Sequence, residues 1–548
     1  MLFMPHFPYT TRACCLLTGL LLSACANEAP EQQANPAAER KARSASAIEV
    51  EQRVMADAAL YAPAPMARMQ VMSTPSRERY PDTPENALML TSEQPVSTFS
   101  VDVDTGSYTN VRRMLNQGFL PPADAVRAED FINYFAYSYP APDNAEVFSI
   151  NTELAASPWN PKRHLFKVGL QGQMLDKQQR KAANLVFLLD VSGSMNAPDK
   201  LPLLISSLRL LTSQLGSQDR VSIVTYAGSS QTVLEPTQGN QRGRIQTALE
   251  TLSAGGGTNG EGGILRAYQL ARSSFIKEGV NRVILATDGD FNVGMSDLEE
   301  LKALIRRQRE SGIALTTLGF GSGNYNDALM ESLSNLGNGQ HAYIDSINEA
   351  RKVLVDELTS SMEIIAADVK IQVEFNPALI SEYRLVGYHN RLLEREDFNN
   401  DKVDAGEIGA GHRVTAIYEI ALTGSGGEQI DPLRYQSSGA QGSFAKELAQ
   451  IKLRYKLPSE TKSQLVSKVV SLDQLSSEEV QGDFAFAAAA AGFAQMLKGG
   501  KYMQDSDYQT LLALAQRGKG SDPQGYRHEF INLLKSAELI SQSSAFTE

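Results

Sequence analysis

Three short segments of the chain carry oxygen-bearing side chains in an arrangement that can bind a metal ion. Asp190, Ser192 and Ser194 follow one apolar run, Thr258 lies in the glycine-rich segment 255–260, and Asp288 follows a second apolar run. These side chains are two carboxylates and three hydroxyls, without a histidine or a thiol. Such a set suits a hard cation such as Mg²⁺ (or Mn²⁺) in near-octahedral geometry, with positions left for water and a ligand.

An alternation of apolar runs and amphipathic segments predicts the elements that position these residues. Buried strands are expected at 185–189, 221–226, 283–286, 314–320 and 342–344. Between them, two sets of apolar residues each share a helix face: Leu201, Leu204, Ile205, Leu208, Leu211 and Leu215, and Ile264, Tyr268, Ala271 and Phe275. This alternation predicts an α/β fold with a mostly parallel sheet and helices on both faces. Asp190 and Asp288 then lie at the carboxyl ends of strands, where such sheets bind ligands.

The glycine-rich segment also satisfies the G-x-G-x-x-G pattern of dinucleotide sites, at Gly255, Gly257 and Gly260. That pattern requires a strand directly before it, whereas a helix is expected at 244–252. A nucleotide site is therefore disfavoured.

On the five residues named first, the sequence resembles the von Willebrand factor type A (VWA) fold with its metal-ion-dependent adhesion site (MIDAS), over roughly 184–362. The resemblance implies that the hydroxyls bind the metal directly or nearly so, that the aspartates act partly through water, and that a partner's carboxylate takes the open position. Phe291 and Val293 are expected to form an apolar rim around it. Further segments at 100–108, 120–122, 287–294 and 319–327 resemble the bacterial YfbK-like VWA lipoproteins, from about residue 96 to the C-terminus.

Half-buried strand patterns flank the α/β region on both sides, at 147–154 and 165–170 before it and at 369–375, 414–420 and 451–457 after it. Because neither side alone offers a complete sheet, we expect one β-sandwich into which the VWA domain is inserted. Helices are expected at 111–117, 127–135, 484–497, 508–515 and 526–539. The aromatic run Tyr134, Phe135, Tyr137 and Tyr139 is expected to pack in the core, and Ala487–Ala491 to let two helices approach closely.

The N-terminus reads as an export signal, with Arg12 before an apolar run at 13–22. The segment Leu22-Ser23-Ala24-Cys25 resembles a bacterial lipobox, which implies cleavage before Cys25 and acylation of its thiol. Ala26 after the cysteine implies the outer membrane of a Gram-negative bacterium. The expected parts are a signal peptide (1–24), a flexible tether (25–95), an N-terminal α/β family segment (96–180), the VWA domain (181–362), and a β-rich then helical domain (363–548).

A net charge of -12 without a basic cluster argues against a nucleic-acid partner. We therefore expect a non-enzymatic, membrane-anchored adhesion or scaffold module of the cell envelope that captures an Asp or Glu of a partner protein through the metal. The alternative is an envelope enzyme with catalytic groups in the C-terminal domain. There, Ser443-Phe444-Ala445-Lys446 matches S-x-x-K, but S-D-N and K-T-G are absent from the sequence. A VWA partner of a cytoplasmic ATP-driven cation-inserting machine is disfavoured by the export signal.

Overall fold

The structure, a computed structural model, describes residues 77–545 apart from 144–145, 176–179, 290, 292–297, 358–359, 361, 432–443, 459 and 505. The predictions for the signal peptide and Cys25 lie outside the described residues. Within the described part of the chain, no helix combines the length and apolar character that crossing a membrane requires.

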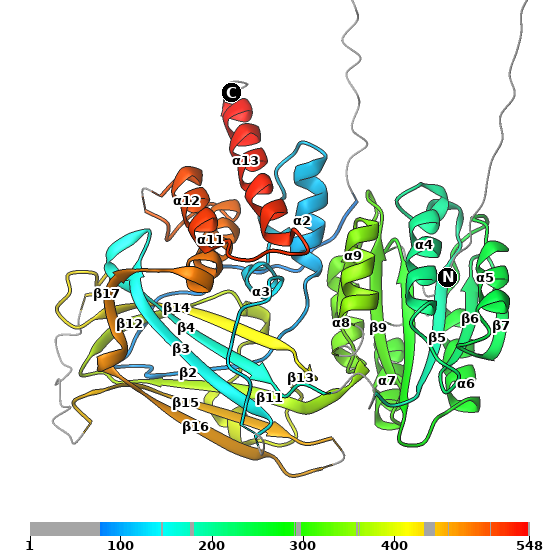
Figure 1. Ribbon diagram of the computed structural model, residues 1–548, viewed down its shortest axis with the longest axis horizontal. Helices are drawn as coiled ribbons and strands as arrows, with labels where there is room; N and C mark the ends of the chain where they lie inside the picture. The colour runs from blue at the N-terminus through cyan, green and yellow to red at the C-terminus, as the bar shows by residue number, and fades with distance from the viewer. Residues whose placement is uncertain are drawn as a thin grey trace, which may run out of the picture. The chain divides into compact units, whose positions relative to one another are not determined.

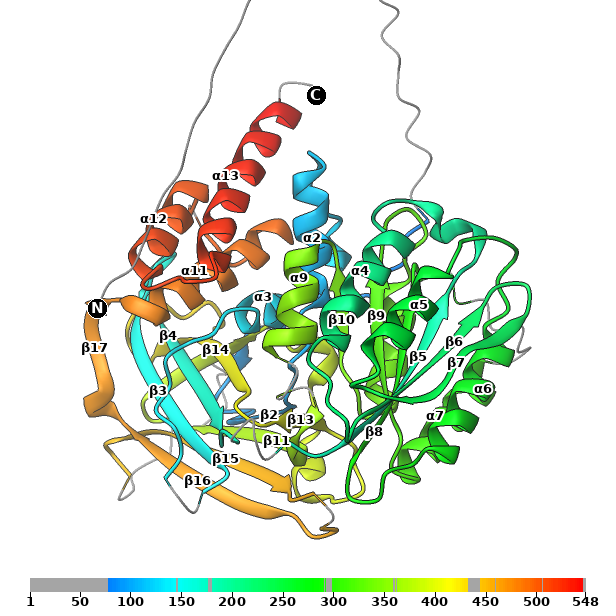
Figure 2. The same ribbon diagram turned by 45° about the vertical axis from the view of Figure 1, so that its right-hand side comes forward.

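A six-stranded sheet forms the centre of the α/β domain (Figures 1 and 2), in the order β10-β9-β8-β5-β6-β7. Its strands are β5 (Ala183–Asp190), β6 (Arg220–Tyr226), β7 (Ser230–Gln238), β8 (Val280–Thr287), β9 (Ala314–Phe320) and β10 (His341–Ile344). All neighbours are parallel except β7, which runs antiparallel to β6. The five predicted strands are confirmed. The sequence pattern did not predict β7, because this edge strand carries polar and exposed residues.

Helices cover both faces of this sheet, as predicted. The helices are α4 (Leu201–Thr212), α5 (Arg242–Glu250), α6 (Gly260–Ser273), α7 (Leu298–Glu310), α8 (Asp327–Leu336) and α9 (Ile347–Arg351), which a π-helical turn at Lys352–Asp356 follows. Successive residues of β5 pack on opposite faces of the sheet: Phe187 packs with α4, α5 and α9, whereas Leu188 packs with α6, α7 and α8. Phe275 was wrongly assigned to the buried face of α6. It is 42% exposed because the helix ends at Ser273.

Strands from both sides of the inserted domain form a β-sandwich, as predicted (Figure 1). One sheet has the order β1-β12-β14-β4-β3-β17, and the other has the order β13-β11-β15-β16 with β2 also on β11. The strands are β1 (Met89–Leu90), β2 (Val96–Ser100), β3 (Phe148–Ser157), β4 (Asn160–Gly172), β11 (Ile364–Phe375), β12 (Ile380–Val386), β13 (Gly406–Gly409), β14 (Arg413–Leu422), β15 (Glu447–Lys456), β16 (Gln464–Ser471) and β17 (Leu475–Glu479). Gly169 of β4 lies opposite Thr415 of β14, so the two flanking segments share one sheet.

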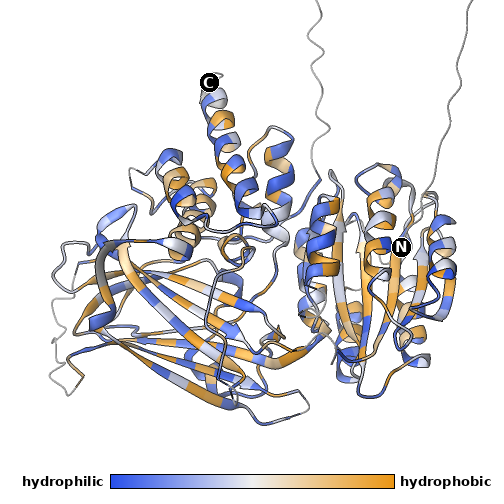
Figure 3. Cartoon of the chain, viewed as in Figure 1, coloured by the Kyte–Doolittle hydropathy of each residue, from blue (hydrophilic) through white to orange (hydrophobic). Residues whose placement is uncertain are grey.

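The helices outside the α/β domain share a core of aromatic and small residues. They are α2 (Gly106–Asn116), α3 (Ala128–Asn133), α11 (Gly482–Leu497), α12 (Tyr508–Gly518) and α13 (Tyr526–Ala545), and short 3-10 turns are η1 (Ala123–Ala125), η3 (Gly193–Asn196), η5 (His389–Arg391), η6 (Arg395–Asn399) and η7 (Leu472–Gln474). The Phe135 ring lies 4.8 Å from that of Phe486 and 5.3 Å from that of Phe530, which confirms the aromatic run as core. Ala487–Ala491 are fully buried, and the apolar character of α11 is visible in Figure 3. A Cβ added to Gly492 would lie 2.6 Å from Leu511 of α12, so the predicted close approach is confirmed.

The last part of the predicted tether is wrong, because residues 77–95 belong to the folded part. The Arg79 N–H donates to the carbonyl of Tyr325 at 2.9 Å, and β1 pairs with β12. These contacts are backbone hydrogen bonds, which every residue except proline can donate. Amino-acid composition alone therefore does not predict these contacts.

Candidate metal site

The candidate site lies where the strand order of the α/β sheet reverses, between β5 and β8. Parallel register places Leu189 of β5 beside Ala286 of β8, so the two strands end at the same edge. Asp190 is the last residue of β5, and Asp288 directly follows β8. Loops at such a reversal separate to opposite faces and leave a crevice where α/β sheets bind ligands.

Asp190 is fully buried and accepts hydrogen bonds from Ser192, Thr287 and Tyr226. Its Oδ1 accepts the Ser192 N–H at 2.9 Å, and its Oδ2 accepts the hydroxyls of Thr287 at 2.9 Å and Tyr226 at 3.2 Å. Burial raises the pKa of Asp190, while the hydrogen bonds from Ser192 lower it and the charge of Asp288 raises it further. A carboxylate in this environment carries a charge that a bound cation would stabilise.

The serine hydroxyls of the first segment lie next to each other. Ser192 Oγ and Ser194 Oγ are 3.0 Å apart; Ser192 is buried, whereas Ser194, on η3, is exposed. Adjacent oxygen ligands of an octahedral ion with bonds of about 2.1 Å lie about 3.0 Å apart. The serine pair therefore fits Mg²⁺, and one of its members faces solvent.

Backbone hydrogen bonds bring the loop that carries Thr258 to the same place. The Gly193 N–H donates to the carbonyl of Gly256 at 3.1 Å, and the Gly255 N–H donates to that of Val191 at 2.8 Å. Gly256 has φ +82°, a conformation that favours glycine. These bonds hold the loop that carries the half-buried Thr258 against the segment of Asp190 and the serines.

Asp288 is fully buried and has a partner that sequence reasoning missed. The Lys200 ammonium donates to Asp288 Oδ2 at 2.8 Å and to Asn324 Oδ1 at 3.2 Å. After Asp288 the chain turns at Gly289, with φ +92°, where a Cβ would lie 2.3 Å from the Asn326 nitrogen. Lys200 matches no spacing rule, because it directly precedes α4 and reaches Asp288 only through the fold.

The predicted apolar rim is wrong for Phe291. This side chain is only 4% exposed, its ring lies 5.5 Å from that of Tyr226, and it packs against Gly260. It is apolar and inside the core of the domain, where it supports α6. Val293 lies outside the described residues.

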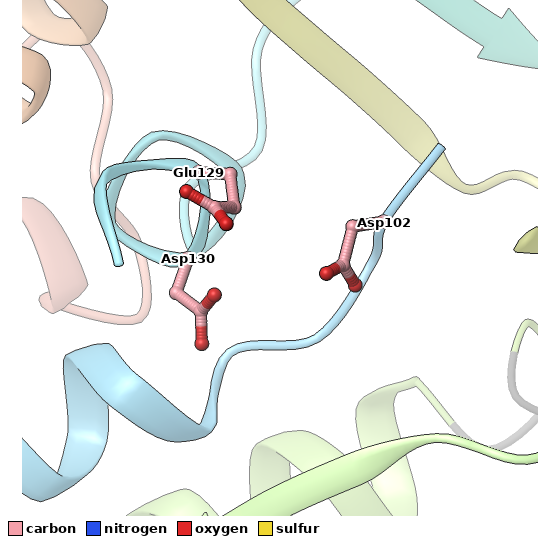
Figure 4. A group of neighbouring side chains, drawn as sticks. All are labelled: Asp102, Glu129 and Asp130. Carbon is pink, nitrogen blue, oxygen red and sulfur yellow. The ribbon is translucent and has the colours of Figure 1, made fainter. Parts of the chain in front are cut away.

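A second group of carboxylates lies away from these loops: Asp102 follows β2, and Glu129 and Asp130 belong to α3 (Figure 4). One oxygen of each lies within 4.8 Å of the others. Two of the three carboxylates have a guanidinium partner, since Arg391 donates to Asp102 at 2.7 Å and Arg127 to Asp130 at 3.2 Å, and burial raises the pKa of Glu129. We therefore interpret the three carboxylates as members of a buried network of ion pairs.

The network also ties the segment 100–108, which the sequence singled out, to the α/β domain. The His341 N–H of β10 donates to Asp104 Oδ1 at 2.8 Å, and Arg127 forms an ion pair with Asp327 of α8. Arg112 of α2 pairs with Asp345 at 2.6 Å, next to the same sheet. The segment 100–108 therefore contributes to the contacts that join the sandwich and its helices to the α/β domain, which gives this segment a structural role.

Family models match most of the described chain. One described as the C-terminal part of the uncharacterized protein YfbK matches residues 360–540, one described as a von Willebrand factor type A domain matches 184–356, and one described as von Willebrand factor matches 74–167. The uncharacterized protein YfbK of Escherichia coli (strain K12) is 44% identical over 497 residues, which cover 89% of this chain and 86% of that protein.

More distant similarities concern parts of the chain. Inter-alpha-trypsin inhibitor heavy chain H3 of Pongo abelii is 29% identical over 262 residues, covering 44% of this chain and 29% of that protein. Among solved structures, a von Willebrand factor type A protein from Catenulispora acidiphila aligns with a TM-score of 0.39 and 15% identity, over 69% of this chain and 88% of that chain.

Proposed function

Because the chain belongs to the YfbK family and carries a VWA domain, we propose that it is a metal-dependent binding protein of the cell envelope. VWA domains generally mediate interactions between proteins, often with a bound metal. In this proposal a Mg²⁺ (or Mn²⁺) ion lies at the end of β5 and β8 and captures a carboxylate of a partner protein. The observation that carries the proposal is the serine pair, 3.0 Å apart, beside the buried Asp190.

The proposed ligands have distinct roles. Ser192, Ser194 and Thr258 would supply neutral hydroxyl oxygens, and Asp190 and Asp288 would compensate the charge, partly through water. When bound, the ion would act as an electrophile for an anionic oxygen. Neutral inner ligands leave much of a dication's charge uncompensated, so an Asp or Glu of the partner satisfies the open position better than water does. Ser194 is exposed, which supports access from solvent.

The proposal includes an anchor. Acylation of Cys25 would attach the chain to the envelope, at the outer membrane of a Gram-negative bacterium, and the residues that follow would act as a tether. The lipobox-like segment 22–25 supports this part. The acidic balance of the chain supports a protein partner and no nucleic acid.

Affinity capture from envelope extract tests the proposed function, with the full chain as bait in Mg²⁺ and in EDTA. Thr258→Ala removes a proposed hydroxyl ligand and should weaken Mg²⁺-dependent capture at least tenfold while leaving thermal unfolding in EDTA unchanged. Thr251→Ala is the matched control, because Thr251 is an exposed threonine of the same domain whose hydroxyl donates to the Ala248 carbonyl. Capture that persists undiminished in EDTA and in Thr258→Ala would show that the metal site is not the recognition surface.

A further inference from the structure

Lys200 places a buried positive charge directly at the proposed metal site. Its ammonium donates to Asp288 Oδ2 at 2.8 Å, and the two side chains are 9% and 0% exposed. Asn324, on the loop after β9, accepts a second hydrogen bond at 3.2 Å. Lys200 is therefore a component of the site, although it is not one of the five MIDAS-like positions.

The loop after β9 fixes the side chain in this position. Gly321 has φ +67°, and a Cβ added there would lie 2.3 Å from Cγ and 2.4 Å from Cε of Lys200. The methylene chain thus packs directly on the backbone of that loop, whose Gly321 carbonyl accepts the Tyr343 hydroxyl. The backbone of this loop therefore closes one side of the stem and limits the directions in which the ammonium can turn.

The ammonium changes the charge that a metal ion meets. The carboxylates of Asp190 and Asp288 carry a formal charge of about −2 together, and Lys200 reduces this to about −1. We propose that Lys200 sets this charge and thereby weakens Mg²⁺ binding, while it holds the Asp288 carboxylate in place. A loaded site then keeps a net positive charge, which favours the addition of an anionic oxygen. This inference rests on the proposed function, because it concerns the same metal.

Coulomb's law gives the direction and scale of the effect. Even at the dielectric constant of bulk water, about 80, a unit charge about 5 Å from a dication changes the binding constant by about tenfold or more. Lys200→Met keeps the length of the stem against Gly321 and removes the charge. Lys200→Gln also removes the charge and keeps a donor for Asp288 or Asn324. Both variants should therefore bind Mg²⁺ about tenfold or more tightly than the wild type.

Isothermal titration of the full chain with MgCl₂ measures this directly. Lys452→Met is the matched control: it removes a lysine of β15 that pairs with Glu374 at 3.1 Å in the sandwich, and it should leave Mg²⁺ affinity unchanged. Thermal unfolding provides the second measurement. Without metal, both Lys200 variants should melt below the wild type, because Asp288 loses its counter-charge, and Mg²⁺ should raise their melting temperature more than it raises that of the wild type.

The outcomes separate this inference from the proposed function. Equal Mg²⁺ affinity of the wild type and both Lys200 variants, or weaker binding by the variants, would overturn the role of Lys200 and leave the metal site standing. Absence of Mg²⁺ binding to every variant at millimolar concentration would overturn both. Tighter binding by Lys200→Met and Lys200→Gln, with Lys452→Met unchanged, supports the inference.

Discussion

Replacing Asp190 by Asn should have opposite effects on stability without and with metal. Without metal, burial disfavours the charged carboxylate and Asp288 adds repulsion, as the raised pKa of Asp190 reflects. The Asn oxygen still accepts the Ser192 N–H, and its amide group faces the hydroxyls of Thr287 and Tyr226, which can turn to accept. The variant should therefore unfold with a free energy equal to that of the wild type or up to about 1 kcal/mol higher.

With Mg²⁺ the order should reverse. A ligand that binds only the native state adds about 2.7 kcal/mol at a hundred times its dissociation constant. For a domain of this size, about 1 kcal/mol corresponds to roughly 2–4 °C in melting temperature, so the wild type should gain about 5–10 °C. Asp190→Asn lacks the charge that compensates the ion and should gain little.

Scanning calorimetry of both proteins in EDTA and in MgCl₂ provides the test. Asp404→Asn is the matched control, since Asp404 forms an ion pair with Arg309 and is 48% exposed away from the MIDAS-like residues. The control should respond to Mg²⁺ as the wild type does. An equal rise for wild type and Asp190→Asn, or a strongly destabilised variant in EDTA, would refute this account of the site.

Three further predictions concern other parts of the chain. Arg391→Met leaves Asp102 and Asp104 buried without their guanidinium partner, and urea unfolding should show a loss of about 3–5 kcal/mol; a loss no larger than that of the exposed Arg351→Met would contradict it. Burial raises the pKa of Asp104 from its usual 3.8 to about 7, so its protonated form stabilises the fold at low pH and this contribution is lost as the pH rises through about 7. Asp104→Asn should therefore flatten the fall in unfolding free energy between about pH 4 and pH 7, and an unchanged slope would refute the assignment. Cys25→Ser should abolish labelling by a palmitate analogue, and label retained by the variant would exclude Cys25 as the acylated residue.

Much of the fold could be predicted because its strongest signals are local. A continuous apolar run such as 185–189 identifies a strand buried on both faces, and Phe187 and Leu188 indeed pack on opposite sides. The strand β7 and the segment 77–95 escaped prediction, because their side chains are largely polar. Backbone pairing holds both of them, and the ion pair of Glu78 with Arg113 also holds the segment 77–95. The sequence pattern also did not predict that α6 ends at Ser273, so Phe275 was wrongly expected on the buried face of that helix.

The candidate site likewise has residues that local spacing predicts and residues that only the fold brings together. Asp190, Ser192 and Ser194 lie within five residues, so their types and spacing reveal them. Lys200 and Asp288 are 88 positions apart, and only the fold brings the ammonium to the carboxylate. Phe291 shows the opposite error: a position next to the motif suggested a rim, but whether an apolar side chain faces solvent depends on packing against Tyr226, which no local pattern contains.

The insertion of the α/β domain into the sandwich has a consequence for how the chain assembles. All strands of the α/β sheet lie within 183–344, whereas the sandwich pairs Gly169 with Thr415 across the whole inserted domain. Such distant pairing is slow, because chain entropy is lost before the contact forms. We therefore expect the α/β domain to fold first, while the hairpin of β3 and β4 keeps one apolar face uncovered until β11, β14 and β15 have been synthesised. That uncovered face exposes apolar side chains of the growing chain to aggregation, and we expect the folding yield to depend on how quickly the late strands cover it.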